Sequence, residues 1–256
     1  MNSTVTSAGS TPPEAPCEPH LRVENLGLQR EGRRWLFRHM NWEIPRHQFI
    51  ALTGPSGVGK SSLLRVLCGL EKSSEGAVSY CCNEGCTHNP GQFQNKIGVV
   101  FQNLRLTPNA SLLHNVLCGR LSRYAWWQTA TGFPSNEQAQ AFELLKEFGI
   151  GHLGKRWVAE VSGGEQQRAA LARTLFQEPE ILLADEPVSQ LDRKLTHQVL
   201  TRLKNYVKEK NATVLCVLHE PALVQKYADQ VLSLDPNTPE AWKVRPPSCP
   251  LPPALT

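Results

Sequence analysis

Two kinds of hydrophobic pattern alternate along the chain. In residues 21–52, short apolar runs alternate with polar positions, which predicts antiparallel strands. Residues 181–184 and 212–218 are instead continuous apolar runs, separated by a helical pattern over about 193–208. Continuous apolar strands that alternate with helices are typical of a parallel sheet covered on both faces. The pattern therefore predicts an α/β protein with a mostly parallel core sheet flanked by helices and an antiparallel β subdomain.

The middle of the chain has a different periodicity. Between residues 104 and 149 the pattern becomes helical, and a second strongly helical pattern covers 165–176. The apolar side chains spaced for one helix face are Ala139, Phe142, Leu145 and Phe148. We therefore expect a helical subdomain at about 104–164, inserted into the α/β domain.

Both ends of the chain differ in composition from the rest. Residues 1–20 are rich in Ser, Thr and Pro, and residues 236–256 are rich in Pro, without hydrophobic periodicity. We predict that both are tails around a single domain spanning 21–235.

Composition and charge limit the function classes. Of 256 residues, 40% are hydrophobic and 20% charged, which fits a globular protein with a proper core. A net charge of +4 over this length gives no argument for nucleic acid. No apolar run approaches the roughly 20 residues that span a bilayer, and the N-terminus lacks the apolar core of a secretory signal. We expect a protein of the cytoplasm.

The eight cysteines are expected to be reduced thiols, as is usual in a cytoplasmic chain of this size. One cluster could hold a metal, and it consists of Cys81, Cys82, Cys86 and His88. Cys81 and Cys82 are adjacent in a strand predicted at 77–82, so their side chains point to opposite faces. Because this spoils a compact tetrahedral site, structural zinc is disfavoured.

The candidate chemistry centres on a glycine-rich loop between a strand and a helix. The loop matches G-x-x-x-x-G-K-[ST], and its glycines let backbone N–H groups converge on phosphate oxygens. Lys60 can reach the β- and γ-phosphates of a nucleotide, and the Ser61 hydroxyl can hold Mg²⁺. The alternative is an ordinary glycine turn with a surface lysine. The predicted nucleotide-binding residues of this loop are Gly54, Pro55, Ser56, Gly57, Val58, Gly59, Lys60, Ser61 and Ser62.

Two carboxylates follow the apolar run 181–184. Ligands of parallel sheets bind at the carboxyl ends of the strands, and Asp185 and Glu186 lie at such an end. Asp185 is placed to hold the Mg²⁺ shell, and Glu186 to polarise a water for attack on the γ-phosphate. The alternative is a pair of solvated turn acids.

A second anion site is predicted at the start of the helix at 165–176. Ser162, Gly163, Gly164 and Glu165 precede or open this helix, whose free N–H groups and dipole favour phosphate. An ordinary capping box between Ser162 and Glu165 explains the same residues, and both interpretations can hold together. Gln102 and His219 each follow a predicted strand. Alone, either is more often a surface residue.

Taken in order, these segments resemble the ATP-binding subunit of an ABC transporter over about residues 21–235. The matching motifs are GPSGVGKS as Walker A, Gln102 as the Q-loop, VSGGEQQR as the signature, ILLADE as Walker B, residues 188–192 as the D-loop and His219 as the switch histidine.

The resemblance implies a mechanism. Two subunits pair head to tail as a homodimer, and each ATP lies between one subunit's Walker A and the other's Ser162, Gly163, Gly164 and Glu165. Glu186 activates water, and His219 contacts the γ-phosphate. Gln102 joins Ser61 and Asp185 at the Mg²⁺ and links the site to the helical subdomain. ATP and Mg²⁺ are the implied cofactors.

Residues 115–150 look like the helical subdomain of phosphonate importer ATPases. That likeness implies integral membrane permease subunits, a periplasmic solute-binding protein, and a peripheral location on the cytoplasmic face of the inner membrane, without nucleic acid. Trp126 and Trp127 could dock the permease or belong to the subdomain core.

Four features depart from the family pattern. Val161 and Glu165 stand where leucine and glutamine are usual in the signature, and Gln190 stands where a small residue is common in the D-loop. No tyrosine or phenylalanine lies between residues 26 and 32, where relatives commonly stack adenine, and Trp35 is the nearest candidate.

Alternative functions stay open. A soluble ABC-type ATPase acting on nucleic acid or ribosomes would carry a second cassette or a long coiled-coil insertion, which the sequence lacks. A degenerate subunit with a structural role, an exporter and a transporter of another solute are the others.

Overall fold

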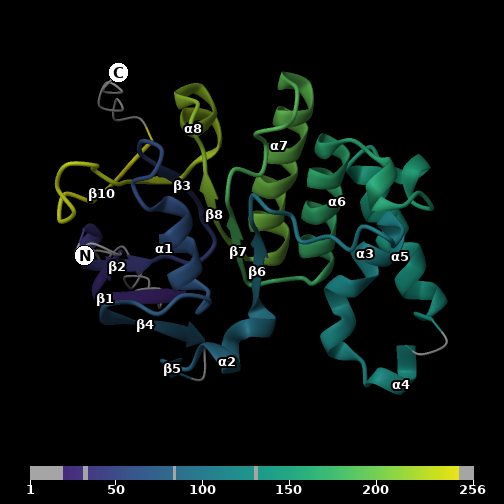
Figure 1. The fold of residues 1–256 in the computed structure, drawn as a ribbon, viewed down its shortest axis with the longest axis horizontal. Helices are drawn as coiled ribbons and strands as arrows, with labels where there is room; N and C mark the ends of the chain where they lie inside the picture. Colours follow the sequence, from purple (N-terminus) through teal and green to yellow (C-terminus); the bar gives the residue numbers. More distant parts are fainter. Residues whose placement is uncertain (1–19, 31–33, 83–84, 130–131, 248–256) are drawn as a thin grey trace, which may run out of the picture.

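The computed structural model describes residues 20–30, 34–82, 85–129 and 132–247 (Figure 1). Most of the predicted N-terminal tail, residues 1–19, and residues 248–256 of the predicted C-terminal tail lie outside the described residues. His20, the last residue assigned to the N-terminal tail, is buried and its Nδ1 lies 2.8 Å from the Thr213 hydroxyl. The folded domain therefore begins at least one residue earlier than predicted.

An antiparallel sheet forms one side of the molecule, with strand order β2-β1-β4-β5. Its strands are β1 (Leu21–Gln29), β2 (Trp35–Ile44), β4 (Glu75–Cys82) and β5 (Gly85–Thr87). The alternating pattern of 21–52 places large apolar side chains such as Leu26, Phe37 and Met40 in the core. The antiparallel subdomain predicted from that pattern is confirmed for residues 21–44, but β3 (Phe49–Thr53), at the end of the same segment, is a parallel strand of the second sheet.

The second sheet has the order β10-β9-β3-β8-β7-β6 and is parallel except at β10. Its strands are β3 (Phe49–Thr53), β6 (Ile97–Val100), β7 (Ile181–Ala184), β8 (Thr213–Val217), β9 (Gln230–Ser233) and β10 (Lys243–Arg245). Every residue of β3, β7 and β8 is buried, as the continuous apolar runs predict.

Strand β10 corrects one boundary. The sequence assigned residues 236–256 to a tail because of their prolines, but Lys243, Val244 and Arg245 pair with β9. An unpaired edge of β9 would expose a row of backbone hydrogen-bonding groups, and the returning chain satisfies them. The ordered sheet therefore extends to Arg245.

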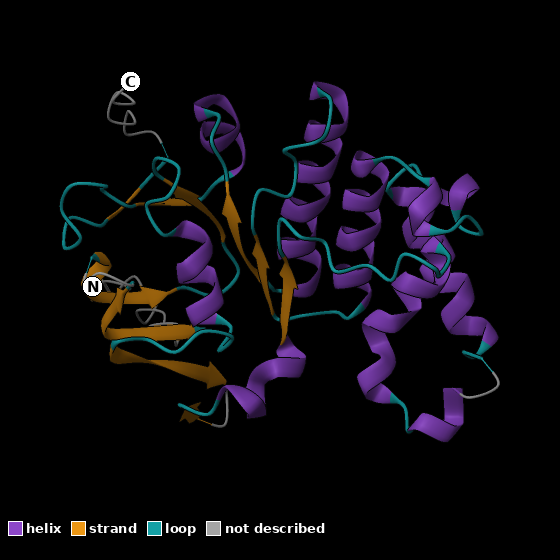
Figure 2. Ribbon diagram, in the orientation of Figure 1, coloured by secondary structure: helices purple, strands orange, loops and turns teal. Residues whose placement is uncertain are grey.

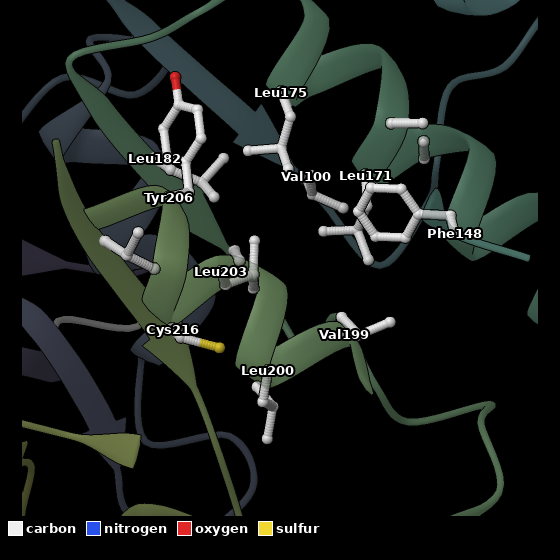
Figure 3. Packing of buried hydrophobic residues seen from close by; sticks show 14 of the residues in the cluster. Val100, Phe148, Leu171, Leu175, Leu182, Val199, Leu200, Leu203, Tyr206 and Cys216 are labelled. Atoms are coloured by element: carbon white, nitrogen blue, oxygen red, sulfur yellow. The ribbon is translucent and has the colours of Figure 1, made fainter. Parts of the chain in front are cut away.

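Successive residues of the parallel strands point into two different cores. Leu52, Leu183 and Leu215 belong to the core shared with the antiparallel sheet and α1 (Lys60–Leu67). On the other face, Leu182 and Cys216 pack with side chains of α6 (Gly163–Phe176) and α7 (Arg193–Lys210), as Figure 3 shows. Helix α8 (Pro221–Tyr227) adds Leu223, Val224 and Tyr227 to this second core.

The helical subdomain lies beside α6, at the right of Figure 2. Its helices are α3 (Leu112–Leu117), α4 (Trp126–Thr129) and α5 (Ser135–Glu147), and a short helix α2 (Pro90–Phe93) precedes β6. The buried Arg120 ties the subdomain to α6 because its guanidinium donates to the Phe176 carbonyl and to Glu137. Segment 104–111, predicted as helical, is a loop that leads from β6 to α3.

The buried face of α5 differs from the predicted one. Ala139 is exposed, and the buried face runs through Glu137, Ala141 and Leu145. Glu137 is buried because it pairs with Arg120 at 3.0 Å, which no hydrophobic periodicity could reveal.

The expectation that all cysteines are reduced is wrong for one pair. Cys81 on β4 and Cys86 on β5 stand opposite each other in the strand register and form a disulfide. Cys68, Cys118 and Cys216 are free thiols. The side chain of Cys82, the other sulfur of the proposed metal cluster, lies outside the described residues, as do Cys17 and Cys249.

Within the described residues, the longest helices are too short or too polar to cross a lipid bilayer.

Candidate functional site

The phosphate loop joins the end of β3 to the start of α1. Gly54 and Gly59 have φ angles of 140° and 110°, which favour glycine. A Cβ at Gly54 would lie 2.8 Å from the carbonyl oxygen of Leu234, and one at Gly59 would lie 3.0 Å from the Cβ of Leu36. The loop can therefore bend this tightly only with glycine at both positions, and its tip, residues 55–57, is exposed.

Lys60 begins α1 and folds back over this loop. Its ammonium donates to the carbonyl oxygens of Gly54 and Pro55, at 2.8 Å each. Burial lowers the pKa of Lys60, while the nearby carboxylates of Glu186 and Asp185 act to raise it. The lysine is therefore a largely desolvated charge within electrostatic reach of both acids, placed where the loop would meet phosphate.

Asp185 leaves the end of β7 and is buried, with 5% of its surface exposed. Burial raises the pKa of its carboxyl group, and a hydrogen bond with the Ser61 side chain acts in the opposite direction. A hydroxyl and a carboxylate in contact are the oxygen ligands that Mg²⁺ prefers, so this pair fits the ion. The pair also links the phosphate loop to β7.

Gln102 lies one strand further along the sheet. Strands β6 and β7 are parallel with Val100 opposite Ala184, so Gln102 and Glu186 both leave the sheet two residues after that pair. The side chain of Gln102 is exposed. Its position at the same edge of the sheet is compatible with the predicted contact to Mg²⁺.

Glu186 and His219, predicted to act on water and on the γ-phosphate respectively, are in direct contact with each other. Strands β7 and β8 are parallel with Ala184 opposite Cys216, and His219 follows three residues later. The His219 Nε2 lies 2.7 Å from the Glu186 Oε1. Both side chains remain accessible to solvent, so they can meet a water and a phosphate group.

The predicted second anion site lies elsewhere in the same chain. In Figure 1, α1 and α6 stand apart, with β6, β7, β8 and α7 between them. Ser162 caps α6, and its backbone N–H and hydroxyl each donate to the Glu165 carboxylate at 2.7 Å. These hydrogen bonds lower the pKa of Glu165. The capping box is therefore present, and Ser162 and Gly163 remain exposed.

The family model described as ABC transporter matches residues 37–189 of the chain. The chain belongs to the ABC transporter family. The loop at 54–62, predicted as the Walker A motif, and the helix start at 162–165, predicted as part of the signature, both lie within the matched residues.

Curated relatives narrow the comparison. A phosphonates import ATP-binding protein from Trichormus variabilis is 38% identical over 220 residues, which cover 84% of this chain and 89% of that protein. Another, from Bdellovibrio bacteriovorus, is 38% identical over 85% of both chains. A hypophosphite import ATP-binding protein from Stutzerimonas stutzeri is 35% identical over 84% of this chain and 64% of its own length.

Solved structures of ABC cassettes have the same fold. A dimeric bacterial ABC transporter cassette superposes with a TM-score of 0.76 at 27% identity, covering 87% of this chain and 97% of the other. The cbiO1 protein of Clostridium perfringens, part of an ABC transporter complex, gives 0.73 at 26% identity over 90% and 89%. A second structure of the first cassette, a dimer in a post-hydrolysis state with ADP and phosphate, gives a TM-score of 0.75 at 27% identity over 87% of this chain and 97% of the other. Cassettes of this family bind adenine nucleotides and work as ATPases.

Two residues predicted for nucleotide binding have other contacts in this ABC cassette. The Ser62 hydroxyl accepts a hydrogen bond from Arg30 at 3.0 Å and keeps its own O–H as a donor. The guanidinium of Arg38 lies 4.4 Å from the centre of the Trp35 ring. Leu36, not Trp35, lies against Gly59. Alternation of side chains along a strand could have indicated that neighbours 35 and 36 face different sides.

Sequence reasoning also missed Gln167. It lies within the signature helix, is buried, and donates to the carbonyl oxygen of Glu186 at 2.9 Å. The side chain is polar and only 3% exposed, a combination that the sequence alone does not reveal.

Proposed function

We propose that this chain is the ATP-hydrolysing subunit that energises an importer for phosphonates or a related small oxyanion. The ATPase part rests on one observation above all. Lys60, Asp185, Glu186 and His219 come from three different segments and converge where β3, β7 and β8 end. The solute rests on the relatives, which are named for import of phosphonates and hypophosphite.

The residues divide the work of hydrolysis among them. Lys60 exchanges its two carbonyl partners for the phosphate oxygens of ATP, since a charged acceptor makes the stronger hydrogen bond. Ser61 and Asp185 would hold Mg²⁺, with Gln102 as a further ligand, and the bound ion would supply neutralisation of charge on the phosphates.

Glu186 takes the proton of the attacking water. The water oxygen bonds to the γ-phosphorus as the bond from that phosphorus to the bridging oxygen breaks, leaving ADP and inorganic phosphate. His219, 2.7 Å from the carboxylate, holds Glu186 in place and is itself positioned to contact the γ-phosphate.

The complete site needs two copies of the chain. Ser162, Gly163 and Gly164 lie apart from the phosphate loop of their own chain, and Ser162 and Gly163 are exposed. A head-to-tail pair would bring the helix start of one copy to the ATP held by the other, where its N–H groups and dipole favour phosphate. Cassette dimers among the solved relatives support this arrangement.

Permease subunits and a solute-binding protein would complete the importer. The chain would then act as a peripheral subunit on the cytoplasmic face of the membrane, with the helical subdomain and Gln102 facing the permease. Closing and reopening of the dimer would drive the transport cycle.

The proposal is tested in vesicles that contain the chain, its permease and its binding protein. We expect ATP hydrolysis and solute uptake to rise together when a phosphonate is added outside, and both to fail with Glu186→Gln. Stimulation by hypophosphite or phosphate alone would keep the importer and replace the solute. Stimulation by RNA or ribosomes without the permease would contradict import altogether.

A further inference from the structure

Gln167 links the signature helix to the segment that follows β7. It lies five residues beyond the N-cap Ser162, on the side of α6 that faces residues 186–190. Only 3% of its surface is exposed. A polar side chain this buried requires partners, and it finds them in the backbone around the proposed catalytic carboxylate.

Both ends of its amide are used. The Nε2 donates to the carbonyl oxygen of Glu186 at 2.9 Å and lies 3.4 Å from the Ser189 hydroxyl oxygen. The Oε1 accepts from the backbone N–H of Gln190 at 3.3 Å. Because a carbonyl faces one end and an N–H faces the other, the orientation of the amide is determined. Gln167 thus joins both ends of the turn at 186–190.

That turn includes a residue in an unfavourable conformation. Glu186 has a φ of 52°, in the left-handed region that residues other than glycine seldom adopt. Such a conformation persists only where neighbouring groups fix it. Ser189 helps from within the turn, through its hydroxyl at 3.1 Å from the Glu186 carbonyl oxygen. Gln167 fixes the same oxygen from another element.

The same turn touches the exposed start of α6. A Cβ built on Gly163 would lie 2.3 Å from the Gln190 Oε1, and one on Gly164 would lie 3.0 Å from the Gln190 carbonyl oxygen. The glycines of the signature and the turn that follows Glu186 therefore pack closely within one chain. A movement of the start of α6 would therefore shift the turn at 186–190, and with it Glu186.

We infer that Gln167 is a positioning residue that holds the backbone of Glu186, so that its carboxylate stays against His219, and transmits contact at Ser162–Gly164 to that carboxylate. The second part rests on the proposed function, because it takes the partner copy's ATP as the group that reaches Ser162. The contacts of the Gln167 side chain are to residues 186, 189 and 190. Its effect on hydrolysis passes through Glu186.

The test replaces Gln167 by methionine, which keeps the length of the side chain and removes the hydrogen bonds of its amide to residues 186, 189 and 190. In the full-length chain with Mg²⁺ and ATP, we expect kcat to fall at least about tenfold, since misplacement by about 1 Å can cost about 10²-fold. The Kd for ATP, measured by fluorescent nucleotide displacement, should stay within about twofold, because the phosphate loop is unchanged. Gln167→Asn, which keeps the amide but shortens the reach, gives a second reading where the methionine variant folds poorly.

Two further variants separate positioning from general destabilisation. Tyr206→Phe also deletes a buried hydrogen bond, from the Tyr206 hydroxyl to the Pro179 carbonyl at 2.9 Å, and should leave kcat at the parental level. In a Glu186→Gln background, Gln167→Met should lower the residual turnover no further, because the group it positions is already gone.

Specific outcomes would overturn the inference. Parental kcat in a folded Gln167→Met protein would do so, and so would an equal proportional loss in the parent and the Glu186→Gln background. Both can occur while Glu186→Gln alone abolishes turnover, which would leave the proposed ATPase mechanism standing. Failure of import with normal basal hydrolysis would instead contradict the proposed transport role and leave this measurement valid.

Discussion

The phosphate loop and the signature segment are both predicted anion sites, but they differ in burial and in how far apart in the sequence their residues lie. Around the loop, Lys60 and Asp185 are buried, and strands from distant parts of the sequence place them. Ser162 and Glu165 lie three residues apart and satisfy each other at the surface. The first site depends on the sheet, whereas the second depends on a single helix start.

This difference predicts how strongly substitutions at each site affect ATP binding and hydrolysis. Substitutions near the loop remove buried charges whose interactions water cannot take over. Their effects on ATP binding and hydrolysis should therefore be large. Changes at the signature affect groups that solvent can reach, and their effects on the isolated chain should be small. Variants on the two sides can therefore be ranked.

The largest effect is expected for Glu186→Gln. Removing the general base should lower kcat by about 10²- to 10⁴-fold, as release of inorganic phosphate would show, while ATP binding persists. Glu220→Gln is the matched control, because Glu220 is an exposed acid one residue after His219 and makes no side-chain cap bond. Turnover close to the parental value in the Glu186 variant would remove that residue from its proposed role.

Lys60→Ala should weaken ATP binding. A hydrogen bond to a charged group contributes about 1.5 to 3 kcal/mol, and losing that binding free energy corresponds to an increase in Kd of about 10- to 100-fold. The exposed Lys208 on α7 provides the control, and Lys208→Ala should bind ATP normally. Equal affinity in the two variants would show that Lys60 does not reach the phosphates.

On the signature side, Ser162→Ala should separate two properties. Loss of the N-cap should destabilise the fold by about 1 kcal/mol in denaturant unfolding. The Kd for ATP of the isolated chain should not change, because Ser162 caps α6, which stands apart from α1 in Figure 1. A weaker Kd in the monomer would break the separation between the two sites.

The smallest effect concerns pH and Glu165. Hydrogen bonds from Ser162 hold the pKa of Glu165 below its ordinary value of 4.5. A depressed folded pKa means that its stabilisation is present at neutral pH and is lost as pH falls below about 4.5 through the folded pKa. Parent and Glu165→Gln should therefore differ in stability by less than about 1 kcal/mol at pH 7 and converge in acid. A difference that grows as pH falls would contradict the lowered pKa.

Much of the loop-side site could be predicted from the sequence. The continuous apolar runs identified β7 and β8, and polar residues after such strands are expected at the carboxyl ends of a parallel sheet. The structure brings Lys60, Asp185, Glu186 and His219 together there, and their roles in hydrolysis stay a prediction.

Contacts that leave no periodic pattern in the sequence could not be predicted. The bond from Gln167 to the Glu186 backbone joins two elements whose relative rotation is set only by packing. The Cys81–Cys86 disulfide depends on the register in which β4 and β5 pair, which places the two residues opposite each other. Pairing of β10 depends on an edge of β9 that no local pattern reveals.

The most direct test of the central claim is complementation between two inactive variants. Lys60→Ala removes one half of the site, and Gly163→Asp puts a carboxylate at the other half, where a helix start tolerates it. Because random pairing makes about half of the dimers mixed, each with one intact composite site, co-expression should restore about a quarter of the parental ATPase sites. The account predicts that recovery. Purified mixed dimers that stay as inactive as the separate variants would contradict a site shared between two copies.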